Sequence, residues 1–506
     1  MAYRDLRHYL EVLEQKGKLR RVRKEVDKDW ELACIARWVF QSLPDNERYG
    51  LRFEKVKGFD VPVVLGALGA SREVYALALE TTPDRIYEKW CHALSSPVAP
   101  CPAKEAPVKE VIKKGKEVNL LEIPVPVFTP GRDDGPYVSS SAVITKDPDT
   151  GIQNVGNYRQ RIIARDRVGI LIAPTQHIGM HYFHKYQPRK EPMPIAISIG
   201  NDPTVALTAV AKVPYGVDEL CVAGGFRGEG IPVVRAETVD LMVPANSEYV
   251  IEGYVMPHVR DKEGQFGEFT GYMGIESDRT FIQVQCVTRR KNPLYHGFLS
   301  QIPPSESSLV RSQAFAANLY KHLVYDLKEP SVRDVHFTEA GGSEMMLIVQ
   351  VKPMYPGHAR KVGLVAANLL ASSLGKFVYI VDDDIDIRDP FSVEWALSFR
   401  VDPVRDVQIL PHSFFHILDP AVGQAENVRA GVAPGSKIVV DATMKGIYPQ
   451  VSLPPKKYMM EVYENWEATG LPAIKITDRT RLLLERHGEG LSYNPFESLT
   501  APSSSG

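Results

Sequence analysis

The spacing of apolar residues predicts a mixed α/β unit over residues 1–115. Apolar side chains recur at helical intervals over residues 5–16, and Gly17 follows them as a stop signal. The same criteria predict a helix that begins near residue 29, helices at 71–79 and 83–94, and strands at 51–53 and 61–65. Four prolines within residues 95–107 then indicate a linker towards the next part of the chain.

From residue 116 the pattern changes to short strands separated by glycine and proline. The apolar runs predict strands at 139–145, 158–164, 168–172, 194–199, 249–255 and 281–288. Many short strands of this kind favour a barrel or sandwich-like core with helices added. We therefore expect a second, β-rich domain over residues 116–304.

A long helix over residues 305–327 is expected to lead into a C-terminal α/β domain, residues 328–490. Its pattern is strand, helix, strand at 344–351, 358–374 and 377–381, which is typical of a βαβ unit in a partly parallel sheet. Residues 395–399 and 437–441 are expected to extend that sheet. Two helices are expected within residues 455–487, and residues 491–506 are expected to form a tail.

Composition narrows the classes of function. The 506 residues include 60 Lys and Arg against 62 Asp and Glu, a formal net charge of -2 that argues against a dedicated nucleic-acid binder. The charged N-terminus and the absence of an apolar run of ~18 residues predict neither a secretory signal nor a membrane span. The five cysteines form no C-x-x-C pair, so a reduced, cytoplasmic setting is the simplest interpretation.

Two separate stretches hold the residues with the clearest chemistry. Asn154–Arg159 supplies one guanidinium, and Lys262–Tyr272 supplies Glu263 and Glu268 among several glycines. An Arg holds a carboxylate in a fixed fork, and two carboxylates beside it can divide into an ionised partner and a group that carries a proton. A solvated surface ion pair explains the same residues without any function.

Three further motifs offer alternatives. His177, His181 and His184 are spaced to share one helix face, which predicts a metal site and hence a metal-dependent hydrolase; a single ligand, His177, is the other interpretation. The glycine-rich run 224–230 predicts a mobile surface loop or a phosphate-binding loop. The acidic run 382–386 predicts a solvated turn or a cation site at the end of a strand.

Several short motifs, taken in order and with their separations, resemble the UbiD family of reversible decarboxylases, which use prenylated FMN. The resemblance is collinear over nearly the whole chain. The motifs are Asn154-x-x-x-x-Arg159, Gln176-His177, Asp218-Glu219, Val243-Pro244-Ala245-x-Ser247-Glu248 and Glu263-Gly-x-Phe-Gly-Glu268. Gln265 stands where the family commonly has proline, a departure that removes no reactive group.

The resemblance implies a role for each matching residue. A divalent metal, usually manganese, would bridge the cofactor phosphate to the protein, with potassium nearby. Its implied ligands are Asn154, His177 and Glu219. The implied catalytic residues are Arg159, Glu263 and Glu268, of which Glu268 would donate and accept the proton. The further implied contacts are Gln176 and Lys437 for the cofactor, and Ala173 and Phe269 for the substrate pocket.

The resemblance also implies a mixed α/β and β architecture and an assembly. A split β-barrel would bind the cofactor, and a linking helix would lead to a C-terminal α/β domain that forms a homodimer or homohexamer. The likeness to bacterial hydroxyarylic acid decarboxylases implies an aromatic, phenolic acid that exchanges CO2, and a flavin prenyltransferase would supply the cofactor. A non-catalytic subunit of a multi-chain carboxylase is the alternative within this family.

Overall fold

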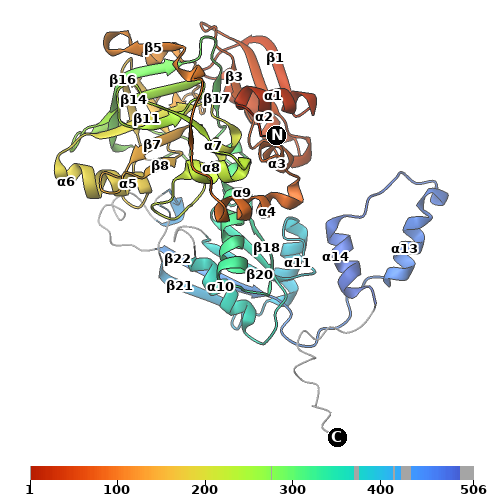
Figure 1. The fold of residues 1–506 in the computed structure, drawn as a ribbon. Helices are drawn as coiled ribbons and strands as arrows, with labels where there is room; N and C mark the ends of the chain where they lie inside the picture. Colours follow the sequence, from red (N-terminus) through yellow and green to blue (C-terminus); the bar gives the residue numbers. More distant parts are fainter. Residues whose placement is uncertain are drawn as a thin grey trace. The chain divides into compact units, whose positions relative to one another are not determined.

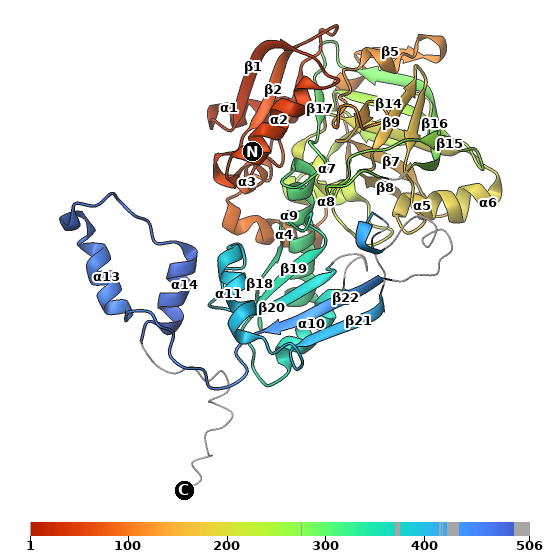
Figure 2. The same cartoon turned by 180° about the vertical axis from the view of Figure 1, so that it is seen from behind.

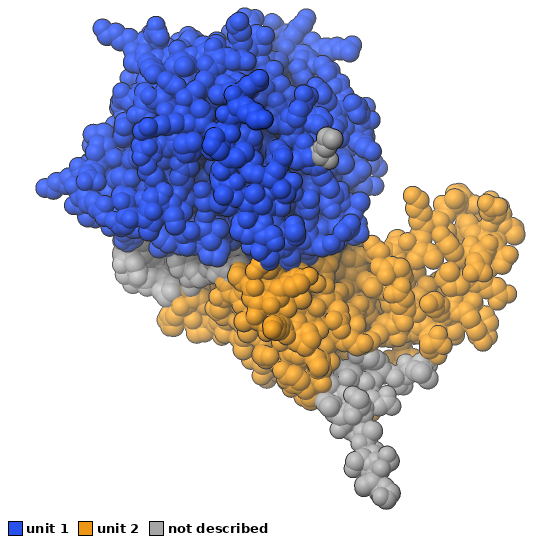
Figure 3. Space-filling view, viewed as in Figure 1, with its two compact units in different colours: residues 1–318 blue, residues 319–506 orange. Residues whose placement is uncertain are grey.

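The computed structural model describes residues 2–274, 276–369, 375–413, 416, 418–422 and 435–489, without the side chains of Glu263 and Ser277. The chain divides into two compact units, Met1–Asn318 and Leu319–Gly506, which Figure 3 colours separately. The finer division into four regions stays a prediction, and the predicted tail 491–506 lies outside the described residues.

The N-terminal part of the first unit is a four-stranded sheet with helices, as the apolar spacing predicts (Figure 1). Its strands are β1 (Leu19–Val26), β2 (Gly50–Val56), β3 (Val63–Leu65) and β17 (Tyr295–Gly297), in that order across the sheet. Its helices are α1 (Leu6–Gln15), α2 (Glu31–Ser42), α3 (Arg72–Ala78) and α4 (Ile86–Ser95). Strand β17 pairs parallel with β3, so a segment far along the chain completes this sheet.

The larger sheet of the first unit has ten strands and is open. The path runs β6-β9-β10-β16-β14-β11-β7-β8, with β15 and β5 also paired to β16. The strands are β5 (Val111–Lys114), β6 (Tyr137–Val138), β7 (Ala142–Lys146), β8 (Gln153–Gly156), β9 (Gln160–Ala164), β10 (Arg167–Ile170), β11 (Met193–Ile199), β14 (Tyr249–Val255), β15 (Asp261–Glu263) and β16 (Ser277–Arg289). No pairing joins β6 to β8 among the described strands, so the expected barrel is not closed.

Shorter elements complete the first unit. A three-stranded sheet contains β4 (Cys101–Pro102), β12 (Pro232–Arg235) and β13 (Met242–Pro244), and the helices are α5 (His177–His181), α6 (Gln187–Arg189), α7 (Pro203–Thr208) and α8 (Glu219–Arg227). Apolar residues of β7, β8, β11 and β14 form one buried cluster with residues of α7 and α8. Strands β7 and β8 are therefore packed against α8, so Asn154 on β8 and Glu219 on α8 belong to neighbouring elements.

The glycine-rich run 224–230 begins inside a helix. The prediction of a surface loop is therefore wrong for the first residues of this run. Gly224 and Gly225 belong to α8 and are buried. A Cβ on Gly224 would lie 2.3 Å from the carbonyl oxygen of Val98, and one on Gly225 would lie 2.7 Å from that of Ala93. These glycines are present because another backbone packs directly against the helix.

Helix α9 (Glu306–Tyr320) accounts for most of the long helix expected over residues 305–327, and a π-helical turn, Lys321–Asp326, follows it. The Glu306 carboxylate is fully buried and accepts hydrogen bonds from the backbone N–H groups of Gly66 (2.7 Å), Leu68 (3.0 Å) and Leu299 (3.1 Å). This buried acceptor joins the start of α9 to the N-terminal sheet. In the described part of the chain, no helix is long and apolar enough to cross a bilayer.

The second unit contains a five-stranded sheet in the order β18-β19-β20-β22-β21 (Figure 2). The strands are β18 (Val332–Phe337), β19 (Met346–Val351), β20 (Phe377–Asp382), β21 (Val407–Ser413) and β22 (Gly435–Ala442), and the helices are α10 (His358–Asn368), α11 (Pro390–Arg400), α13 (Lys456–Glu464) and α14 (Asp478–His487). Strands β19, β20 and β22 are parallel, and α10 connects the first two. The predicted βαβ unit and the two C-terminal helices are thus confirmed. The predicted helix 358–374 ends earlier, at Asn368, and its residues 370–374 lie outside the described residues.

Two expectations for the second unit are wrong. Residues 395–399 are not a strand but part of α11, whose N-cap Asp389 accepts the N–H of Phe391 at 3.3 Å. The acidic run is not a solvated turn, because Asp382 and Asp384 are buried and pair with Arg400 at 2.8 and 2.6 Å. A buried guanidinium between two carboxylates satisfies the charges that the sequence pattern placed in water.

Candidate active site

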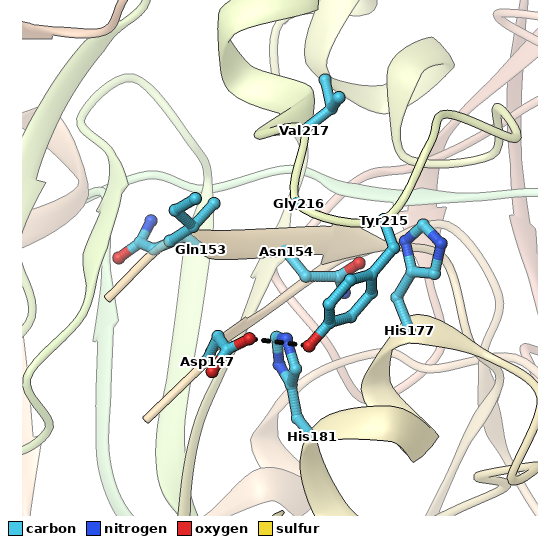
Figure 4. A pocket seen from close by; sticks show the side chains of 9 residues that line it. Asp147, Gln153, Asn154, His177, His181, Tyr215, Gly216 and Val217 are labelled. Carbon is cyan, nitrogen blue, oxygen red and sulfur yellow. Dashed lines mark hydrogen bonds between the residues drawn. The ribbon is translucent and has the colours of Figure 1, made fainter. Parts of the chain in front are cut away.

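A small pocket opens between the β7–β8 hairpin, the start of α5 and the loop before α8 (Figure 4). Its lining residues are Asp147, Ile152, Gln153, Asn154, His177, His181, Tyr215, Gly216 and Val217. Two of the predicted metal ligands, Asn154 and His177, are among them. The pocket therefore brings together residues that are 23 positions apart in the sequence.

Asn154 lies on β8, where the register places it opposite Thr145 of β7. Its side chain is buried, and Nδ2 makes no well-aligned hydrogen bond among the described residues. Burial raises the pKa of Tyr158, and an interaction with the Asn154 side chain offsets part of that rise, so the Tyr158 hydroxyl is its nearby polar group. A buried polar atom without a well-aligned partner costs about 1–3 kcal/mol, so a water, an ion or a ligand is expected to satisfy it. The choice between amide O and N is an assignment, so the oxygen can equally be the atom presented to a cation.

Glu219 is the first residue of α8, and the N-cap Asp218 fixes that helix start by accepting the N–H of Leu220 at 2.8 Å. The Glu219 carboxyl is buried; its Oε2 accepts the N–H of Val155 at 2.7 Å, and its Oε1 lies 3.9 Å from His177 Nδ1. Burial raises the pKa of Glu219 to about 8. A cation bound in the pocket would reverse this shift by favouring the carboxylate.

His177 begins α5, one residue after Gln176, whose Oε1 accepts the N–H of Ala173 at 2.9 Å. Burial lowers the pKa of His177, and the nearby charge of Lys212 lowers it further. The imidazole is therefore neutral at pH 7, the state in which a ring nitrogen can bind a metal. An amide, an imidazole and a carboxylate form a donor set that fits a divalent ion of the manganese type.

The three-histidine metal site is not formed. Helix α5 ends at His181 and passes into a π-helical turn, Tyr182–Tyr186, whose wider period turns His184 to solvent. His181 Nδ1 instead lies 3.0 Å from Thr145 Oγ1. Across the described residues, no three or more His, Cys, Asp or Glu side chains are grouped to hold a metal.

A buried ion pair forms the second part of the site. Arg159 Nη1 lies 3.0 Å from Glu268 Oε1, and the two side chains are only 11% and 9% exposed. The Arg159 guanidinium also stacks over Phe266, at 5.5 Å from the ring centroid. The pair is therefore not a solvated surface contact, which was the alternative that the sequence left open. The Glu263 side chain lies outside the described atoms, although its backbone ends β15.

The turn that carries Glu268 is closed by its own backbone. The N–H of Glu268 donates to the carbonyl of Tyr272 at 2.9 Å, and the N–H of Gly274 donates to that of Phe266 at 2.8 Å. Phe269, on the same turn, is buried with the guanidinium carbon of Arg311 4.5 Å from its ring centroid. Neither Phe269 nor Ala173 lines the pocket described above, and their role towards a substrate stays a prediction.

Arg159 follows Asn154 by five residues, in the short turn that joins β8 to β9. Five residues span at most about 18 Å, and this segment is not extended. A Cβ on Gly156 would lie 2.5 Å from the Tyr158 hydroxyl, so glycine is required where Tyr158 folds back over the strand. The N–H of Asn157 is fixed by the Ala209 carbonyl at 2.7 Å. The turn thus limits how far Arg159 can lie from the pocket residue Asn154.

Lys437 belongs to β22 of the second unit. Its side chain is buried, Nζ donates to the carbonyl of Ala367 at 2.5 Å, and burial lowers its pKa to about 8. These contacts describe a structural lysine of that unit, and its predicted contact with the cofactor stays a prediction.

Sequence patterns missed Asp147 and Tyr215, whose polar side chains line the pocket. The Tyr215 hydroxyl donates to Asp147 at 2.7 Å, and the Tyr215 ring lies edge-on to His177 with 5.4 Å between centroids. Lys185 Nζ also pairs with Asp147, at 2.5 Å. In the sequence, Asp147 is only the start of an Asp-Pro-Asp-Thr-Gly turn, and no spacing links it to Tyr215.

Comparison with known proteins identifies the class. Residues 10–94, 101–303 and 315–442 match the N-terminal, Rift-related and C-terminal domains of 3-octaprenyl-4-hydroxybenzoate carboxy-lyase. An uncharacterized protein from Synechocystis is 32% identical over 511 residues, which cover 94% of this chain and 98% of that protein. These matches extend over all the parts of the chain that carry the site.

Solved structures agree. The UbiD-class enzyme HmfF from Pelotomaculum thermopropionicum, an evolved dimeric form in complex with prFMN, matches with a TM-score of 0.77 at 36% identity over 89% of this chain and 97% of that chain. Vanillic acid decarboxylase from Sedimentibacter hydroxybenzoicus, in closed form, matches with a TM-score of 0.81 at 31% identity over 92% and 100%. The fold and these relatives define a carboxy-lyase. The chain belongs to the UbiD family, as its motifs indicate.

Proposed function

We propose that this enzyme catalyses the reversible, non-oxidative decarboxylation of an aromatic carboxylic acid with prenylated FMN. The observation that carries the proposal is the buried Arg159–Glu268 ion pair, and a pocket lined by Asn154 and His177 in the same unit supports it. The complex of HmfF with prFMN supports the choice of cofactor. The vanillic acid decarboxylase supports an aromatic, phenolic substrate.

In this proposal the pocket holds the phosphate end of the cofactor. Asn154, His177 and Glu219 would bind Mn²⁺, K⁺ would bind nearby, and Gln176 and Lys437 would make further cofactor contacts. Prenylated FMN supplies an electron sink for the electron pair that remains on the substrate when CO2 leaves. The fit rests on the buried Asn154 amide, the buried Glu219 carboxyl and the neutral His177 imidazole.

The chain's own residues would orient the acid and move one proton. Arg159 binds the substrate carboxylate, which competes with Glu268 for the same guanidinium. When Glu268 loses this ion pair, its affinity for a proton rises, and it can deliver that proton to the carbon that has lost CO2. In the carboxylation direction Glu268 removes the proton. Glu263 is proposed as the second carboxylate that orients Arg159.

Aromatic side chains would limit the water around this step. Phe266 is buried beneath the Arg159 guanidinium and packs against Tyr137, with 4.4 Å between ring centroids. A weakly hydrated site strengthens the contact of Arg159 with a carboxylate. Ala173 and Phe269 are proposed to line the pocket for the ring of the acid.

The test is to co-produce the enzyme with a flavin prenyltransferase, supply manganese and potassium, and analyse the released cofactor by absorbance and mass. We expect prenylated FMN, and CO2 release from at least one hydroxylated benzoate in a panel of aromatic acids. Protein that holds no flavin, or holds prenylated FMN but turns over no acid in either direction, would contradict the proposal. The second result would favour a non-catalytic subunit, although such a subunit has no need of the Arg159–Glu268 pair. Light scattering would determine whether the enzyme is a homodimer or homohexamer.

A further inference from the structure

Arg37, in the N-terminal helix α2, donates to a loop that lies against the Glu268 turn. The guanidinium makes four hydrogen bonds to residues 300–304: Nη2 to the carbonyl of Ser300 (2.5 Å) and to Gln301 Oε1 (2.7 Å), and Nη1 to the carbonyls of Ile302 (2.7 Å) and Pro304 (2.9 Å). These acceptors are neutral, so the contact is not an ion pair. A guanidinium with a fixed fork is suited to hold several carbonyls in one arrangement.

One residue of the loop has a backbone conformation that is unfavourable for a non-glycine residue. Gln301 has φ +89°, in the left-handed region that favours glycine. One helical turn beyond Arg37, Gln41 Nε2 donates to the carbonyl of Pro303 at 3.3 Å. Two side chains on the same face of α2 therefore fix the loop, and Arg37 makes most of the contacts.

Gln301 connects the loop to the Glu268 turn through further hydrogen bonds. Its Nε2 donates to the carbonyl of Phe128 and to Thr129 Oγ1. The N–H of Thr129 donates to Asp133 Oδ2 at 2.7 Å, and Asp133 Oδ1 accepts the N–H of Gly267 at 3.0 Å. The chain of hydrogen bonds that begins at Arg37 thus ends one residue before Glu268.

The loop also touches the turn directly on two sides. A Cβ on Gly267 would lie 3.0 Å from Gln301 Cγ, and a Cβ on Gly271 would lie 3.2 Å from Ile302 Cγ1. Gly271 has φ +86°, which the tight turn after Glu268 requires. Residues 301 and 302 therefore form a wall against which the turn 267–271 packs.

We propose that Arg37 is a positioning residue for Glu268: it shapes the 300–304 loop, and the loop in turn fixes the turn that aims the Glu268 carboxyl at Arg159. The role rests on the proposed function of Glu268, but the mechanical part can be tested without a substrate. Arg37 itself touches no residue of the ion pair in any described contact. Burial lowers the pKa of Arg37 only to about 10, so the side chain is charged at pH 7.

The experiment compares the full-length parent with Arg37→Ala by hydrogen–deuterium exchange of native protein. We expect exchange in residues 299–305 and in residues 264–274 to be faster by about tenfold, because the loss of the fork frees both segments to open. Strand β7, residues 142–146, should exchange as in the parent. The matched control is Trp38→Ala, the next residue of the same helix, whose side chain is 72% exposed; it should change neither segment.

The functional arm uses holoenzyme and the aromatic acid that the parent decarboxylates. Arg37→Ala should lower kcat about tenfold with little change in KM or flavin content, since misplacement of a catalytic group acts on the reacting step. Unchanged exchange in residues 264–274, or an unchanged kcat in an active system, would overturn the proposal. If the parent decarboxylates no acid, the proposed function fails, and the exchange comparison still decides whether Arg37 positions the turn.

A second variant covers the case in which Arg37→Ala does not fold. Gln301→Asn keeps an amide that tolerates positive φ but is one methylene shorter, so it cannot bridge Arg37 and Thr129. The same faster exchange in residues 264–274 is expected. Exchange equal to that of the parent in this variant would overturn the proposal as well.

Discussion

Replacing Glu268 by Gln tests the proposed proton transfer most directly. The change keeps the size of the side chain but removes the proton-carrying group and its charge. General acid–base catalysis typically contributes about 10²–10⁴ in rate, which corresponds to roughly 3–5 kcal/mol at ~1.4 kcal/mol per tenfold change. We therefore expect kcat of Glu268→Gln to fall by about this factor.

The same change leaves Arg159 beside a neutral amide. Removal of one partner from a buried ion pair costs about 3–5 kcal/mol, and less where solvent still reaches the pair. Arg159 and Glu268 are about a tenth exposed, so a cost near the low end of that range is expected. Loss of activity must therefore be separated from loss of folded protein by a thermal midpoint and by flavin content.

The assay is CO2 release from an aromatic acid that the parent decarboxylates, with equal prenylated FMN content in parent and variant. Glu276→Gln is the control, because it makes the same change at an exposed glutamate shortly after the Glu268 turn. It should retain the parent kcat. If Glu268→Gln retains more than a tenth of the parent kcat at equal cofactor content, the assignment of Glu268 as proton donor is wrong.

Three further predictions concern the metal, stability and pH. His177→Ala should weaken Mn²⁺ binding to the apoprotein by more than the ~10–100-fold typical of an outer-shell change, whereas the exposed His184→Ala should not; equal affinities in a calorimetric titration would contradict the ligand assignment. Glu306→Ala leaves three buried N–H groups without their acceptor and should cost on the order of 3 kcal/mol, seen as a thermal midpoint lower by several degrees than that of the parent. Burial lowers the pKa of His296 to about 4, below its unfolded value of 6.5, so its contribution to stability is present above pH 6.5 and is lost as pH falls towards 4. His296→Gln should flatten the fall of the midpoint over that range, and an unchanged slope would contradict this.

Local periodicity was sufficient to predict most elements. The apolar residues predicted within 5–16 are the ones that α1 buries, and the strand–helix–strand order of 344–381 is the observed parallel unit. Both patterns depend on residues a few positions apart, which a linear sequence displays directly. The strand predicted at residues 395–399 is wrong because two aromatic residues four positions apart suit a helix as well as a strand. The sequence does contain a helix start signal, Asp389-Pro390, just before this segment.

The candidate site was predictable only in part. The sequence offers Arg159 as a guanidinium and Glu268 as a carboxylate among glycines, and the structure places the two in contact. Composition alone did not distinguish a buried pair from a solvated one, because burial depends on Phe266 and on the turn that surrounds it. The roles of Asn154, His177 and Glu219 came from family motifs, and they stay predictions until a metal is measured.

Sequence patterns do not reveal contacts between a side chain and backbone groups that are far away in the sequence. Arg37 binds carbonyls about 265 positions later, and Glu306 binds N–H groups about 240 positions earlier. Every residue has a backbone carbonyl and every residue except proline has an N–H. The partner of such a contact can therefore be almost any residue type, and the sequence does not mark it. The two contacts nevertheless act on the same segment, since Arg37 holds residues 300–304 and Glu306 binds the N–H of Leu299. Arg37 thus holds the length of the short loop, and Glu306 fixes the residue that precedes it. If Arg37 positions Glu268 as proposed, we expect changes in the N-terminal region to alter the proposed proton transfer without a contact to substrate, cofactor or metal.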